Sequence, residues 1–244
     1  MTQIEVIEPD VRMIVSAITK AVSEDVPNLK GDHPMEFTNY LPIYRDDCIK
    51  ENLREMAWRD GVEALIFMRN TWKGCLLIDK TNMITYTVTT HQNLLLIPRK
   101  QRSNPHFLQS VFGVQNKGLQ GQYVQMELFP MDKFEQEELE QDYNKIVNGF
   151  IDPNDGYKHY VIAYTCDRFE VTKVDVELYD GKFNLVERVS LDEFIKPDFA
   201  KINETVVPEN TVEITANTDM EKPSVTFKND GFVKLKTDLE EKEA

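Results

Sequence analysis

The stretch His159–Leu191 holds three strand-like segments in close succession, and it constrains the fold more than any other part of the sequence. Its first segment, residues 159–168, is apolar on both alternating faces, which is typical of a strand buried on both sides. The second segment, residues 169–180, alternates apolar with charged side chains, which predicts a half-buried strand with one solvated face. Asp180-Gly181 is a common hairpin signal, since glycine accepts positive φ at no steric cost. The stretch therefore predicts a three-stranded antiparallel meander.

A second run of strand-like segments lies earlier in the chain, at residues 62–69, 75–79 and 83–90. We expect the two three-stranded antiparallel meanders, at about 62–90 and 159–190, to belong to one mixed or antiparallel sheet assembly. With amphipathic helices packed on one side of it, this arrangement is an α+β fold. The side chains expected to be buried in the sheet are Tyr160, Ile162, Tyr164, Val174, Val176 and Leu178.

Apolar residues at helical spacing predict amphipathic helices over residues 10–23, 46–59 and 132–149. Residues 104–116 predict another helix, with Asn104 as its cap and a proline at its first position. Residues 27–42 contain three prolines and predict a loop. Residues 91–97 fit either a strand or a helix.

The composition changes after Lys196-Pro197, where only short strand-like pieces remain. We therefore expect residues 1–197 to form one α+β globular domain. Residues 198–244 are expected to form a short β-rich acidic C-terminal appendage, with a small hairpin and a frayed acidic end.

The net charge of −14 favours solubility and opposes general binding to polyanions through long-range repulsion. The three cysteines, Cys48, Cys75 and Cys166, are widely spaced and form no metal-binding pattern, so we expect buried, reduced thiols. No signal-peptide pattern opens the sequence, and no apolar run reaches the length of a membrane helix. These features predict a cytoplasmic protein without membrane association.

No recognised catalytic motif is present. Gly113 and Gly118 have the spacing of a phosphate-binding loop, but leucine and glutamine follow where that loop needs lysine and serine or threonine. Glu63, Asp79 and Lys80 are candidates for the acidic and basic residues of a metal-dependent nuclease. Asp79 and Lys80 would not share a strand face, however, and a salt-bridged turn explains them better. The histidines are isolated in sequence, so we assign no catalytic residue, no metal ligand and no cofactor.

The segment 81–126 contains no Asp or Glu, although the chain has 42 of them. A positive, amide-rich surface on an acidic protein is typical of a docking site for an anionic partner. Arginine and amide side chains also read phosphates and base edges. The alternative is that the acidic helix near residues 132–142 folds back and neutralises the segment. The predicted partner-binding residues are Arg99, Lys100, Arg102, His106 and Lys117.

Residues 69–79 and Pro105–Leu108 resemble stretches of uncharacterised proteins of Gram-positive bacteria and their phages, a resemblance that implies no activity. We expect a non-catalytic cytosolic protein that binds another macromolecule. Its most concrete form is a phage or mobile-element accessory protein that inhibits a host defence or nucleic-acid-processing complex. The expected partner is another protein, with nucleic acid bound through residues 81–126 as a second choice. The alternative function is a nucleic-acid-binding or metal-dependent nuclease-like enzyme whose site is assembled from scattered residues.

Overall fold

The computed structural model describes residues 3–56, 58–100, 102–121 and 134–195. The chain divides into two compact units, Met1–Asp198 and Phe199–Ala244. The second unit lies outside the described residues, and so does the β-rich appendage with its hairpin that the sequence predicts there. All described helices and strands belong to the first unit.

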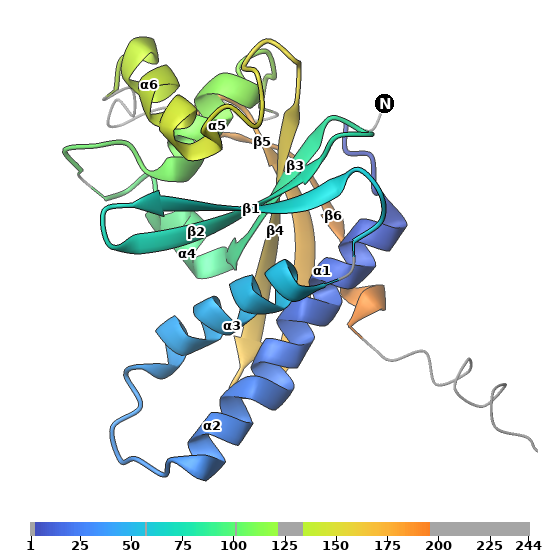
Figure 1. Cartoon of the computed structure of the whole chain (residues 1–244), viewed down its shortest axis with the longest axis vertical. Coiled ribbons are helices and arrows are strands. Elements are labelled where there is room, and N and C mark those ends of the chain that lie inside the picture. The colour runs from blue at the N-terminus through green and yellow to red at the C-terminus, as the bar shows by residue number, and fades with distance from the viewer. Residues whose placement is uncertain (1–2, 57, 101, 122–133, 196–244) are drawn as a thin grey trace, which may run out of the picture. The chain divides into compact units, whose positions relative to one another are not determined.

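One six-stranded mixed sheet, with the strand order β1-β2-β3-β4-β5-β6, forms the middle of this unit (Figure 1). The first three strands form one antiparallel meander and the last three form the other. The parallel pairing of β3 with β4 joins the two meanders. Both predicted meanders and the α+β class are thus confirmed. The strands are β1 Val62–Arg69, β2 Trp72–Asp79, β3 Ile84–Thr90, β4 Lys158–Asp167, β5 Glu170–Tyr179 and β6 Leu185–Ser190.

The helices form two groups, and Figure 1 shows α1 to α3 on the opposite side of the sheet from α5 and α6, while the apolar side chains of α4 pack with α5 and α6. The first group is α1 Glu8–Lys20, the π-helical turn η1 Ala21–Asp25, α2 Val26–Asp32 and α3 Leu41–Glu55. The second group is α4 His91–Leu96, α5 Phe107–Gln115 and α6 Gln136–Val147, and a short 3-10 turn, η2 Asp192–Phe194, follows β6. Each group packs in its own apolar core. The expectation of helices on one side only is therefore wrong.

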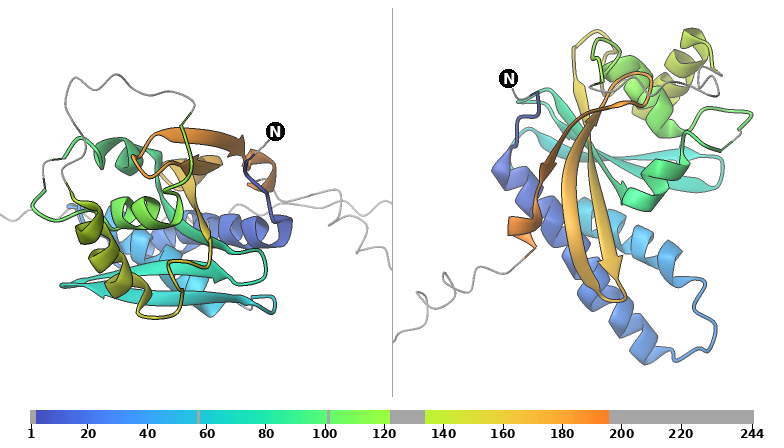
Figure 2. Two further views of the ribbon diagram at one scale, coloured as in Figure 1. Left: turned by 90° about the horizontal axis from the view of Figure 1, so that it is seen from above. Right: turned by 180° about the vertical axis from the view of Figure 1, so that it is seen from behind.

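The two cores take alternate side chains of the same strands. On β4, Tyr160 and Ile162 join α1 and α3, while Val161 and Ala163 join α5 and α6. Figure 2 shows the long β4 and β5 running between both groups of helices. The six side chains predicted to be buried are all at most 3% exposed, which confirms the prediction.

The α1–α2 segment corrects the loop predicted over residues 27–42. Pro27 directly follows the π-helical turn η1, in which the Val26 N–H bonds the Ala21 carbonyl, and the chain stays helical without a break from Glu8 to Asp32. Pro42 lies in the first turn of α3, which begins at Leu41, before the predicted start at residue 46. The helix ends at Glu55, and the Trp58 indole donates to the Leu53 carbonyl at 2.9 Å, so its last turn is closed by a side chain.

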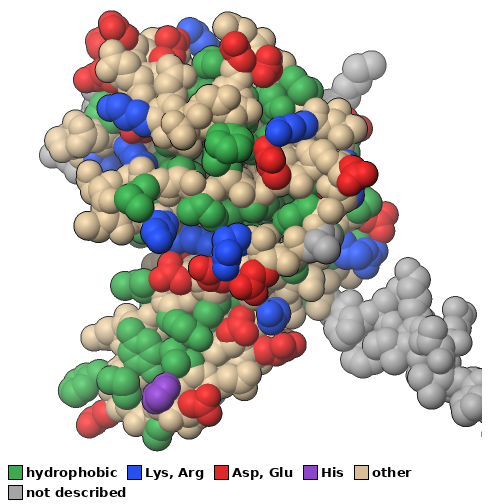
Figure 3. Space-filling model, in the orientation of Figure 1, with side chains coloured by type: hydrophobic (Ala, Val, Ile, Leu, Met, Phe, Trp, Pro, Cys, Tyr) green, Lys and Arg blue, Asp and Glu red, His purple; other side chains and the backbone are tan. Residues whose placement is uncertain are grey.

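The connection between α2 and α3 and the first turn of α3 expose large apolar side chains. Met35 is 56% exposed, Phe37 is 73% exposed and Ile43 is 68% exposed. Figure 3 shows hydrophobic side chains gathered at this end of the molecule. Among the described residues, no helix combines the length and the apolar composition that crossing a bilayer requires.

A buried polar network around His159 links β3, β4 and α5. The His159 ring lies 2.7 Å from the Thr85 hydroxyl through Nδ1 and 3.0 Å from the Thr87 hydroxyl through Nε2. Thr85 donates its own proton to Gln115, so Nδ1 must donate to Thr85 and Nε2 must accept from Thr87. The Asn116 side chain bonds both the N–H and the carbonyl of His159. The ring is therefore fully hydrogen-bonded in its neutral form.

This arrangement predicts a pH-dependent stability. Burial lowers the pKa of His159 to about 3, whereas a histidine in the unfolded chain titrates near about 6.5. Between these values the unfolded state binds one proton more, so stability falls with falling pH, by up to about 1.4 kcal/mol per pH unit. The variant His159→Gln removes this proton, and its urea unfolding midpoint is expected to fall less than the wild-type midpoint between about pH 7 and about pH 5. Parallel curves for the two proteins would contradict the assignment.

Candidate functional site

Four cations form a surface near the end of β1 and the segment after α4, which we call the cationic surface: Arg69, Arg99, Lys100 and Arg102. Ile97 and Pro98 follow α4, and Arg99 and Lys100 then lie exposed on the connection toward α5. Arg102 is partly exposed. Three of the five predicted partner-binding residues thus lie on one connection.

The charges of this surface act on one another. Burial and the neighbouring charge of Arg69 lower the pKa of Arg102. Arg69 donates to the Pro105 carbonyl at 2.9 Å and forms an ion pair with Asp142 of α6, also at 2.9 Å. Across the described parts of the chain, no carboxylate forms an ion pair with Arg99, Lys100 or Arg102. The acidic helix therefore neutralises Arg69 and leaves the other three cations unpaired within those parts.

The other two predicted residues have different surroundings. His106 caps α5, because its Nδ1 accepts the Leu108 N–H at 3.2 Å while Gln109 accepts the His106 N–H at 2.8 Å. Burial, together with the charges of Arg102, Arg69 and Lys100, lowers the pKa of His106 to about 3. Lys117 follows α5 and lies 3.9 Å from Glu140 of α6. His106 thus stabilises the start of α5 next to the cations, and Lys117 lies beside the acidic helix α6.

An aromatic cluster adjoins the cationic surface. The ring centroids of Trp72 and Phe107 lie 5.3 Å apart, and Phe67 lies 5.7 Å from Trp72. Trp72 is 39% exposed and pairs with Arg69 across β1 and β2. Arginine and tryptophan are among the side chains enriched in protein–protein interfaces.

By contrast, the charged side chains of α3 form internal pairs. Lys50 lies 2.5 Å from Asp46, and Arg54 lies 2.6 Å from Glu51. Figure 3 shows basic and acidic side chains lying together across the middle of its face. Such balanced pairs provide no net charge for a partner.

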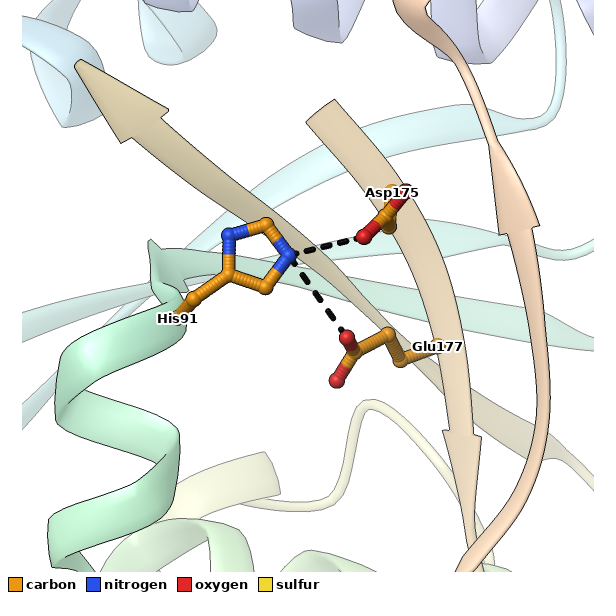
Figure 4. A group of neighbouring side chains, drawn as sticks. All are labelled: His91, Asp175 and Glu177. Atoms are coloured by element: carbon orange, nitrogen blue, oxygen red, sulfur yellow. Dashed lines mark hydrogen bonds and ion pairs between the residues drawn. The ribbon is translucent and has the colours of Figure 1, made fainter. Parts of the chain in front are cut away.

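A second site, which we call the histidine–carboxylate site, brings together His91, Asp175 and Glu177 (Figure 4). His91 is the first residue of α4 and follows β3 directly, while both carboxylates project from β5. Its Nε2 lies 2.9 Å from Asp175 Oδ2 and 3.6 Å from Glu177 Oε1. Both acidic side chains are 1% exposed, and the His91 side chain is 19% exposed. The site therefore opens to solvent on the histidine side.

Further polar groups surround the histidine–carboxylate site. Lys173 Nζ lies 2.6 Å from Asp175 Oδ2, and Arg188 Nε lies 2.6 Å from Glu177 Oε1. The Tyr179 hydroxyl donates to Glu177 Oε2 at 2.5 Å. The Thr165 hydroxyl lies 3.0 Å from His91 Nδ1. The two cations balance the two carboxylates, and both cationic side chains are 44% exposed, so each can turn away into water.

Sequence reasoning missed this site. Asp175 and Glu177 occupy the charged face of a strand predicted to be solvated on that face, and their burial corrects that prediction. His91 lies 84 residues away from Asp175, and only the parallel pairing of β3 with β4 brings the two together. The alternation of charged residues gave no signal of burial, because solvated and buried polar faces have the same period.

Glu63, Asp79 and Lys80, the candidate nuclease residues, do not form one site in the structure. Lys80 forms an ion pair with Glu63 at 2.6 Å on the surface. Asp79 is 0% exposed and pairs with Arg59. Asp79 and Lys80 thus take part in ion pairs at the turn after β2, but with Arg59 and Glu63 rather than with each other.

The described unit is an α+β protein whose mixed sheet carries a cationic surface and a histidine–carboxylate site. The chain belongs to the family of unknown function DUF5986, whose model matches residues 5–242. The matched range extends on both sides of the domain boundary predicted after residue 197. No curated protein and no solved structure matches the chain.

Proposed function

We propose that the protein is a non-catalytic, cytoplasmic binding protein that docks an acidic face of a partner protein on its cationic surface. The observation that carries the proposal is the set of three cations, Arg99, Lys100 and Arg102, that no described carboxylate neutralises. Burial lowers the pKa of Arg102 most, and repulsion by the neighbouring Arg69 lowers it further. A partner that supplies carboxylates relieves this repulsion.

A protein partner suits the surface better than a nucleic acid. The net charge of −14 repels a long polyanion beyond the reach of a few local cations. The exposed Trp72 beside Arg69 adds apolar contact area typical of the centre of a protein interface.

The wider role that we propose is that of a phage or mobile-element accessory protein that inhibits a host defence or nucleic-acid-processing complex. An inhibitor needs affinity rather than chemistry, which agrees with a sequence that has no catalytic motif. Its residues 69–79, which resemble stretches of phage and Gram-positive proteins, include Arg69 and Trp72 of the docking region.

The triple variant Arg99→Ala, Lys100→Ala, Arg102→Ala tests the docking proposal. Exposed charges contribute little to stability, so its unfolding midpoint should match that of the wild type. Its capture of the partner from a lysate of the source organism should fall sharply, because the interface loses its cations. A control with the same change of charge elsewhere on the surface combines Lys30→Ala, Lys145→Ala and Lys158→Ala, all exposed in the structure. Equal loss of capture in both variants would mean that net charge, not this surface, determines binding.

The second candidate function is an enzyme that acts on nucleic acid through a site assembled from scattered residues. The convergence of His91, Asp175 and Glu177 favours it, because buried carboxylates beside a histidine are typical of acid–base and metal chemistry. Cleavage of labelled single- or double-stranded DNA or RNA that disappears in Asp175→Asn would favour this candidate over the binding protein.

A further inference from the structure

We propose that the histidine–carboxylate site binds a divalent first-row transition metal ion through His91 Nε2, Asp175 Oδ2 and Glu177 Oε1. This inference does not rest on the proposed docking function, and it names the ligand of the site that carries the second candidate function. The site lies on the same face of the sheet as α4 to α6, because Asp175 and Glu177 alternate along β5 with the side chains that join the core of α1 and α3. The inference starts from the geometry of the three ligand atoms, which all lie within 4.8 Å of one another.

The separations of these atoms match those around a metal ion. Nitrogen and oxygen ligands lie about 2.1 Å from such an ion, so two of them are about 3.0 Å apart at a right angle and about 3.4 Å apart at the tetrahedral angle. The Nε2 atom of His91 lies 2.9 Å from Asp175 Oδ2 and 3.6 Å from Glu177 Oε1. Both separations from His91 Nε2 therefore fit a shared ion, and the two carboxylate oxygens, which lie within 4.8 Å of each other, adjust to complete the set.

The surrounding hydrogen bonds orient the ligands. Metal-binding histidines usually bond their second ring nitrogen to a fixed polar group, which sets the ring orientation. Thr165 provides that group for His91, at 3.0 Å from Nδ1. Tyr179 holds the distal oxygen of Glu177 through its hydroxyl, which leaves Oε1 directed toward the histidine. Both ligand side chains are thus positioned from outside the triad.

The cations beside the site act as competitors for the metal ion. Lys173 and Arg188 now neutralise the carboxylates, and a divalent ion takes their place as the side chains turn into water. An imidazole nitrogen with two carboxylates favours Zn²⁺ or Mn²⁺ over Mg²⁺ and Ca²⁺, which prefer oxygen ligands alone. Three protein ligands leave a coordination position for water or for an anionic group of a ligand.

Calorimetric titration of the untagged, chelator-treated full-length protein with Zn²⁺ and Mn²⁺ tests the proposal, with Mg²⁺ and Ca²⁺ as comparison ions. We expect one saturable equivalent for the wild type and at least about tenfold weaker binding for His91→Gln. Thr165→Val should weaken binding by about 10- to 100-fold, because the ring loses its orienting group. The exposed His33 provides the matched control, since His33→Gln should leave the titration unchanged.

The variant Lys173→Met separates metal binding from a purely structural ion-pair network. If the site binds metal, removing the competing ammonium should strengthen binding by about three- to tenfold, a gain that misfolding cannot produce. If the charges serve only as ion pairs, the same variant destabilises the fold and gains no metal affinity. Absence of saturable binding in both wild type and Lys173→Met would overturn the proposal. Binding that His91→Gln leaves unchanged, or that Lys173→Met weakens, would overturn it equally.

Discussion

Replacement of Arg59 by alanine is expected to lower the free energy of unfolding by about 3–5 kcal/mol, because it leaves two buried carboxylates without their cation. Arg59 bonds both oxygens of Asp10, at 2.8 and 2.9 Å, and lies 2.5 Å from Asp79. Asp10 is 1% exposed and Asp79 is 0% exposed. The Arg59 guanidinium thus links α1 to the end of β2 through ion pairs.

The two carboxylates respond differently to burial. Burial raises the pKa of Asp10 despite the neighbouring Arg59. Burial would also raise the pKa of Asp79, but hydrogen bonds from Asn82 and the charge of Arg59 outweigh it and hold the pKa below its ordinary value. Without Arg59, Asp10 is the group that protonates more readily. The double variant Arg59→Ala, Asp10→Asn should therefore recover part of the loss.

Urea unfolding of Arg59→Ala beside Arg54→Ala measures the effect. Arg54 pairs only with exposed glutamates of its own helix, so its removal should leave the unfolding midpoint unchanged. An Arg59→Ala midpoint equal to that of the wild type would show that the buried carboxylates find other partners.

The second large effect is expected for Tyr164→Ala, which should lower the free energy of unfolding by about 3–5 kcal/mol, the usual result of truncating a buried aromatic side chain. Tyr164 is 3% exposed on β4, between Thr90 of β3 and Val174 of β5. The guanidinium of Arg45 in α3 lies 5.8 Å from its ring centroid. Loss of the ring leaves a cavity between the sheet and α3.

Tyr164→Phe is the matched control, because it keeps the ring and removes only the hydroxyl. Its unfolding midpoint should stay close to that of the wild type. If Tyr164→Ala proved as stable as Tyr164→Phe, the ring would contribute nothing to the core, and the central position of β4 would be wrong.

The sequence predicts the sheet well because strand signals here are local. β1 spans the residues expected for it, and the alternation on β4 and β5 identifies the buried side chains Tyr160, Tyr164 and Val176 correctly. Helix boundaries are less predictable, because Pro42 opens a helix and Pro27 lies within a continuous helical run, whereas the same residue type elsewhere ends one. The sequence predicts a short turn at Asp180-Gly181. The turn in the structure is longer, because the Asp180 carboxylate accepts backbone N–H groups as far as Asn184.

The two sites differ in how far the sequence predicts them. Three of the four cations of the cationic surface lie in the segment without carboxylates, which charge composition alone reveals, whereas Arg69 lies outside that segment. Asp142 neutralises Arg69, whereas none of the carboxylates in the described ranges pairs with Lys100, and this depends on where α6 packs, which charge patterning does not encode. The histidine–carboxylate site depends entirely on the parallel joining of the two meanders, which no local pattern specifies.

The most direct test of the docking surface is the affinity for the captured partner at two salt concentrations. The triple variant of Arg99, Lys100 and Arg102 should bind about tenfold more weakly than the wild type at about 50 mM salt, mainly through a slower association rate. At about 300 mM salt the difference should shrink to about two- or threefold, since screening already weakens the attraction. The control variant of Lys30, Lys145 and Lys158 should follow the wild type at both concentrations. Equal affinity of the triple variant and the wild type at low salt would contradict the account and leave this segment a solvated connection.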